Sequence, residues 1–64
     1  MLTILEKANY RVEIIRESSF HGLMRFRYNG QIGNWFDIYS NTVDKAKFFL
    51  IKGWKEVEDK ESQD

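Results

Sequence analysis

The alternation of apolar and charged residues predicts β-strands over the first two thirds of the chain. Residues 10–17 alternate up to a doubled isoleucine, which is typical of a half-buried strand. Residues 23–28 alternate again, between large apolar side chains and arginines. The Asn29-Gly30 dipeptide tolerates the positive φ angles of a tight hairpin turn, and residues 31–39 after it have a strand-like composition. We therefore expect three antiparallel strands in a meander.

A single helix is predicted after the third strand. Asn41 or Thr42 can cap its first turn through a side-chain oxygen, and Asp44 places a negative charge where the helix dipole favours it. Gly53 suits the left-handed residue that ends many helices. The stripe at helical spacing consists of Val43, Ala46, Lys47, Leu50 and Trp54. This stripe is the side expected to pack on the sheet.

The two ends of the chain are predicted to lie outside this unit. Residues 1–9 form a short lead-in, in which residues 3–6 (Thr-Ile-Leu-Glu) fit a capping box and favour a helical turn. Residues 55–64 are charged and lack hydrophobic periodicity, so we expect a disordered tail. The predicted fold class is α+β, with one domain at residues 10–54 in which a three-stranded antiparallel sheet is followed by one α-helix packed on it.

The hairpin turn also predicts which side chains share a face of the sheet. Counting back from the turn places Met24 opposite Trp35, and Leu23 opposite Phe36. One face then carries Met24, Phe26, Tyr28, Trp35 and Tyr39, and the other carries Leu23, Ile32, Phe36 and Ile38 among Arg25, Arg27 and Asn34. One helix covers only one face, so the uncovered apolar face is expected to meet a second copy of the chain, a target protein, or both. Alternatively, the lead-in and the tail of the helix fold over it.

Composition favours a small globular domain without covalent reinforcement. A chain of 64 residues buries only about 60% of the surface that its unfolded form exposes, so its core is marginal. The absence of cysteine rules out disulfides and thiolate metal sites, which leaves oligomerisation as a means of stabilisation. No apolar run approaches the roughly 20 residues that span a bilayer, so we expect an unexported, cytoplasmic protein without a membrane partner.

The charge balance argues against nucleic acid as a partner. Lysine and arginine together number 10, as do aspartate and glutamate, so there is no net positive field. A local basic patch can nevertheless persist within a neutral total.

No combination of residues predicts catalysis. His21 is the only histidine, which rules out two-histidine metal sites, and the spacing of the sequence builds no serine or cysteine nucleophile with a partner base around it. Asp37 and Asp44 are interpreted as a strand residue and a helix-start residue rather than as a catalytic pair. Gly30 and Gly33 lack the residues that follow the glycines of a phosphate-binding loop. We expect no enzyme, no catalytic residue, no metal and no cofactor.

Two families share the order of three strands and then a helix. Residues 42–46 (Thr-Val-Asp-Lys-Ala) resemble the segment that opens the helix in the small amino-terminal DNA-binding domain of tyrosine recombinases. In that family the sheet enters the major groove of DNA, so this resemblance implies a small DNA-binding domain.

The second resemblance extends over residues 10–57. It rests on Tyr10-Arg11-Val12 at the start of the first strand, on the aromatic-rich second strand that ends at Tyr28, and on residues 36–44 (Phe-Asp-Ile-Tyr-Ser-Asn-Thr-Val-Asp). The last segment is similar to the strand end and helix start of small phage-encoded protein inhibitors of host uracil-DNA glycosylase. That family forms dimers that imitate duplex DNA.

The second resemblance implies a partner and residues that bind it. The partner is the uracil-DNA glycosylase of the host cell, whose base-stack-intercalating leucine enters a hydrophobic box on the inhibitor. By this resemblance Phe36 lines the box, Asp37 stands in for a phosphate, and Tyr39 supports the contact. Together with the apolar face of the sheet, the predicted partner-binding residues are Phe36, Asp37, Tyr39, Leu23, Ile32 and Ile38. We expect the chain to act as a homodimeric inhibitor, with the recombinase-like DNA-binding domain as the alternative.

Overall fold

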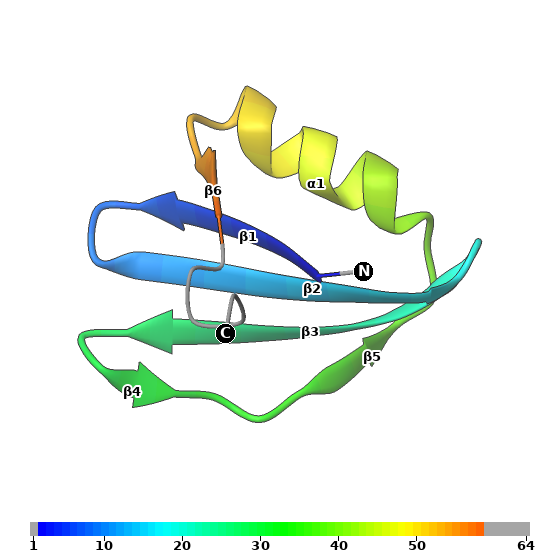
Figure 1. Ribbon diagram of the computed structural model, residues 1–64, viewed down its shortest axis with the longest axis horizontal. Helices are drawn as coiled ribbons and strands as arrows, with labels where there is room; N and C mark the ends of the chain where they lie inside the picture. The colour runs from blue at the N-terminus through cyan, green and yellow to red at the C-terminus, as the bar shows by residue number, and fades with distance from the viewer. Residues whose placement is uncertain (1, 59–64) are drawn as a thin grey trace.

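The computed structural model describes residues 2–58, which form an antiparallel sheet with a helix on one side (Figure 1). In chain order the elements are β1 (Leu2–Lys7), β2 (Tyr10–Ser18), β3 (His21–Tyr28), β4 (Gln31–Ile32), β5 (Phe36–Ile38), α1 (Thr42–Ile51) and β6 (Lys55–Val57). The strands are ordered β4-β3-β2-β1-β6, and β5 pairs with a further stretch of β3. α1 runs from the β5 side of the sheet to the β1 side, which lets β6 pair with β1.

The α+β class with an antiparallel sheet and a helix is confirmed, but the expected number of strands is wrong. The described residues form six strands rather than three. In place of a helical turn near the amino end, β1 lies between β2 and β6. Leu5 in this strand has 0% exposed surface and lies opposite Val12. The gain from burying this side chain in the sheet outweighs the local capping pattern that favoured a helix.

The carboxyl-terminal end also departs from the prediction. Residues 55–57, expected to be disordered, form β6, in which Val57 lies opposite Ile4 of β1. The remainder of the predicted tail from residue 59 lies outside the described residues. Within residues 2–58, the one helix is too short to cross a bilayer.

The strand expected at residues 31–39 is divided in two. The hairpin turn forms as predicted, with positive φ at Asn29 and Gly30. At Gly33 the chain departs from the ladder, although its N–H still donates to the carbonyl oxygen of Phe26 at 2.8 Å. Pairing resumes one residue later than predicted, with Met24 opposite Phe36. Because side chains alternate along a strand, this shift moves Phe36 to the face opposite the one predicted.

The ends of α1 were predicted well. The Asn41 side-chain oxygen accepts hydrogen bonds from the N–H groups of Val43 at 2.9 Å and Asp44 at 3.4 Å. At the other end Gly53 has φ 94°, and the Trp54 N–H donates to the Phe49 carbonyl oxygen at 3.1 Å. These bonds satisfy donors and acceptors that a helix end leaves without partners.

The core lies between α1 and one face of the sheet. Its buried side chains are Leu5, Val12, Ile14, Met24 and Ile38, with Ala46, Phe49 and Trp54 packed against them. Phe49 thus replaces Val43 and Leu50 of the predicted stripe, both of which remain exposed. α1 packs on β1 and β2. As a result, the same face of β3, further along the sheet, is left without a covering helix.

Candidate functional site

The structure separates the residues that the sequence predicted as one binding site. Phe36 and Ile38 of β5 lie on the face that α1 covers in part, and Ile38 is buried in the core. The pairing of the strands places three of the predicted residues on the opposite face of the sheet, namely Leu23, Ile32 and Asp37. Tyr39 follows the end of β5 and is exposed. Of the six, Phe36 is therefore the one that joins a larger exposed surface next to α1.

That surface is made of aromatic rings from the sheet, from the helix and from the residue that precedes β6. We call it the aromatic surface, and its members are Tyr10, Phe26, Tyr28, Phe36, Phe48, Phe49 and Trp54. Neighbouring ring centroids lie between 4.5 and 6.5 Å apart. Phe49 and Trp54 are half-buried at its centre, and the other members are exposed. This surface is not covered because α1 packs on β1 and β2 and does not extend over β3.

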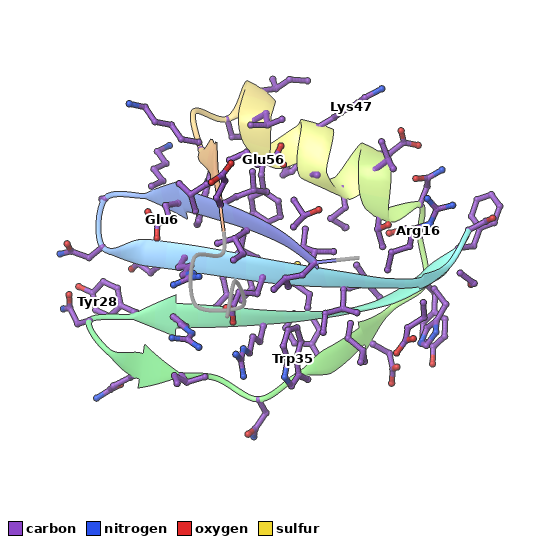
Figure 2. The ribbon with its side chains drawn as sticks, viewed as in Figure 1. Glu6, Arg16, Tyr28, Trp35, Lys47 and Glu56 are labelled. Carbon is purple, nitrogen blue, oxygen red and sulfur yellow. The ribbon has the colours of Figure 1, made fainter. Side chains whose placement is uncertain are left out.

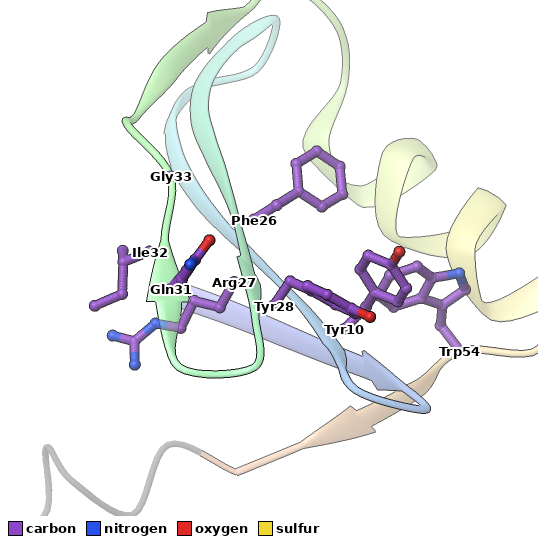
Figure 3. Close-up of a pocket in the computed structure, with 8 residues that line it drawn as sticks. All are labelled: Tyr10, Phe26, Arg27, Tyr28, Gln31, Ile32, Gly33 and Trp54. Carbon is purple, nitrogen blue, oxygen red and sulfur yellow. The ribbon is translucent and has the colours of Figure 1, made fainter.

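One end of the aromatic surface is hollowed. Tyr10, Tyr28, Phe26 and Trp54 line a groove of about 440 Å³, together with residues at the β3–β4 turn (Figure 3). Tyr10 lies directly opposite Tyr28 in the β2–β3 ladder, and their ring centroids are 4.5 Å apart. The sequence analysis did not include these two residues in the site. Counting the β2–β3 register from the alternation could have found them.

At the other end of β5, polar and aromatic groups meet. The His21 Nε2 lies 2.8 Å from the Asp37 Oδ1, and the Tyr39 ring stacks on the His21 ring with centroids 5.1 Å apart. Asp37 is therefore held by an ion pair or hydrogen bond, with its side chain still 52% exposed. This corner brings Asp37 and Tyr39 close together, but on the other side of the strand from Phe36.

The opposite face of the sheet carries a charged cluster that the sequence analysis did not single out. Glu13 of β2 has a side chain that is only 5% exposed, and the Nε atoms of three arginines surround its carboxylate. The Arg27 Nε lies 3.3 Å and the Arg11 Nε 3.7 Å from its oxygens, and Arg25 donates the closest hydrogen bond. We call Arg11, Arg25 and Arg27 the arginine cluster. Their convergence on Glu13 follows from the register, since Glu13 lies opposite Arg25.

Among residues 2–58, no three histidine, cysteine, aspartate or glutamate side chains gather closely enough to hold a metal ion. Comparisons of this chain with protein family models, with curated proteins and with solved structures find no match.

Proposed function

We propose that this chain inhibits a uracil-DNA glycosylase by docking on the enzyme through the aromatic surface, and that it does so as a homodimer. The observation that carries this proposal is the contiguous set of exposed rings beside α1, with Phe36 among them. Monomeric domains rarely leave a large contiguous apolar patch in water, and such patches are typical of protein interfaces. The choice of enzyme rests on the sequence resemblance at residues 36–44.

Phe36 is suited to act as the anchoring side chain. It is 44% exposed, and its ring stacks on Phe26 with centroids 6.3 Å apart. Phe26 in turn contacts the half-buried Phe49 of α1, so Phe36 is supported by rings that reach the core. Aromatic side chains held in this way lose little conformational entropy on binding and are common interface hot spots. Asp37 and Tyr39 lie on the other side of β5, so this contact does not include them.

The size of the Phe36 contribution follows from its exposed area. Burying the exposed part of a phenylalanine, roughly 90 Å², contributes about 2 kcal/mol at about 25 cal/mol per Å². This corresponds to about thirtyfold in affinity. The Phe36→Ala variant is therefore expected to raise the concentration needed for half-inhibition of uracil excision by about thirtyfold.

Phe20→Ala is the matched control. Phe20 is exposed in the turn between β2 and β3 and does not belong to the aromatic surface, so its loss should change inhibition less than threefold. Circular dichroism and sedimentation velocity should show that both variants keep the fold and the mass of the dimer. Equal loss of inhibition in the two variants would contradict the role of Phe36. A parent protein that leaves uracil excision unchanged at high molar excess contradicts the inhibitor function, and a species of only 7.7 kDa contradicts the dimer.

A further inference from the structure

A second groove lies beside α1, on the flank of the helix away from the aromatic surface. It has a volume of about 270 Å³ and is formed by side chains of β1, β2, α1 and β6. We call it the helix groove, and its lining includes Ile14, Arg16, Val43, Ala46, Leu50 and Glu56. No residue that lines it belongs to the aromatic surface or to the groove at the end of that surface. Occupation of the helix groove therefore leaves the proposed docking surface free.

The apolar part of the helix groove is built on buried residues. Ile14 on β2 is 1% exposed and packs in the core, and Thr42 at the start of α1 is 6% exposed. Val43, Ala46 and Leu50 follow one another at helical spacing, so their side chains lie along one flank of α1. Val43 and Leu50 remain 47% and 42% exposed. The small side chain of Ala46 between them leaves space for an apolar ligand along the helix.

The volume of the helix groove limits the size of such a ligand. An apolar cavity of about 150 Å³ holds one benzene molecule, which corresponds to about 25 Å³ for each carbon atom. At this ratio the 270 Å³ of the helix groove accommodates a chain of about ten carbons. This space is too small for the two acyl chains of a membrane lipid. The ligand that fits is therefore a small free molecule.

The rim of the helix groove carries opposite charges at its two ends. Arg16 lies two residues after Ile14 on β2, on the same face, and is found near the start of α1 (Figure 2). Glu56 lies towards the other end of the helix, and Lys47 adds a positive charge on the helix side. Within residues 2–58, neither Arg16 nor Lys47 forms a hydrogen bond or an ion pair with another side chain. Both cations are therefore available to an anionic group.

We propose that the helix groove binds a linear aliphatic carboxylate of about ten carbons. The carboxylate accepts hydrogen bonds from the Arg16 guanidinium, whose planar N–H groups match its two oxygens. The aliphatic chain lies along the flank of α1 at Ala46, where burial removes it from water. Glu56 repels a carboxylate at the far end, which fixes the direction of the ligand. Charge complementarity at one end and an apolar channel behind it together select this class of ligand.

Nuclear magnetic resonance titration of the isotope-labelled full chain with sodium decanoate tests the proposal. A ligand of this size is expected to bind with a dissociation constant on the order of 0.1–1 mM. The amide shifts should saturate and should be largest along the helix groove. Shifts that are largest at the aromatic surface overturn the proposal. Absence of saturable binding up to about 5 mM also overturns it, including the case in which a second copy of the chain covers the groove.

Two positions test the two parts of the ligand separately. Arg16→Gln removes the partner of the carboxylate and should weaken decanoate binding about fivefold, whereas Arg16→Lys keeps the charge and should lose less. Arg16→Gln should leave the binding of uncharged decanol unchanged. Ala46→Leu fills the channel with a residue of high helix propensity and should weaken decanoate and decanol alike, by about tenfold or more. If Ala46→Leu does not fold, the Arg16 variants and the location of the shifts decide the question.

Lys55→Gln is the matched control, because it removes one positive charge from a different place. Lys55 precedes Glu56 on β6, and the alternation along a strand places it on the other face. This variant should change decanoate affinity less than twofold, and circular dichroism should show that each variant compared is folded. Equal losses in Arg16→Gln and Lys55→Gln overturn the proposal, as does equal affinity of the parent for decanoate and for decylammonium. Phe36→Ala should leave decanoate binding unchanged, which separates this test from that of the inhibitor.

Discussion

Replacing Leu5 by alanine tests whether the amino-terminal residues belong to the folded core. Leu5 has 0% exposure and packs with Val12 and Ile14 beneath α1. Removing such a side chain from a core costs about 2–5 kcal/mol, because apolar contacts are lost and a cavity remains. A domain of 64 residues has a free energy of unfolding of roughly 3–10 kcal/mol in total. Leu5→Ala should therefore remove a large part of the stability, which would not happen if residues 1–9 were a lead-in outside the domain.

Leu2→Ala makes the same chemical change on the same strand. Leu2 is 40% exposed and, by the alternation of β1, lies on the other face, so its loss should cost less than about 1 kcal/mol. Urea unfolding, followed by circular dichroism, measures the free energy of unfolding of both variants. With a slope near 1–1.5 kcal/mol per M, the midpoint of Leu5→Ala should fall by about 1.3–5 M relative to the parent, and that of Leu2→Ala by less than about 1 M. Equal midpoints for the two variants would refute the inclusion of β1 in the core.

Two further substitutions test the backbone. Ala8 has φ 55° in the β1–β2 turn, a conformation that disfavours residues with a Cβ, so Ala8→Gly should raise the free energy of unfolding by about 0.5–1 kcal/mol and the melting temperature by several degrees. A Cβ at Gly22 would lie 2.5 Å from the Ile15 carbonyl oxygen and 2.7 Å from Thr42 Cγ2, so Gly22→Ala should cost about 2 kcal/mol or more and lower the melting temperature markedly. An unchanged thermal melt of either variant contradicts the corresponding geometry.

Local signals explain which parts of the fold could be predicted. The Asn29-Gly30 turn and the caps at Asn41 and Gly53 depend on the conformational preferences of single residues, and all three occur where the sequence placed them. β1 and β6 have no such local signal, because each forms a strand by pairing with a neighbouring strand that is distant in the sequence. Residues 55–57 in particular carry two charged side chains and one valine, and pairing with β1 is what orders their backbone. Long-range pairing of this kind leaves no periodicity in a segment of three residues.

The break at Gly33 explains most of what the predicted site missed. One extra residue between β4 and β5 reverses the faces of Phe36 and Ile38, which takes Ile38 into the core and brings Phe36 to Phe26. Gly33 is visible in the sequence, but the register was counted through it as through a regular strand. Which side chains of β5 face outward therefore depends on whether the connection before it has one residue more or fewer. Composition and periodicity do not determine that length.

The positions of the aromatic surface and of the arginine cluster follow from the way α1 packs on the sheet. Because α1 packs over β1 and β2, the rings of β3 and β5 on the same face stay exposed, and they form the aromatic surface. On the other face, which no helix of residues 2–58 covers, the polar positions of the same strands bring the arginine cluster together around Glu13. The alternation that builds the core in β2 and β3 thus also sorts their apolar and cationic side chains to opposite faces. The two surfaces meet at Arg27, which belongs to the arginine cluster and also lines the groove at one end of the aromatic surface.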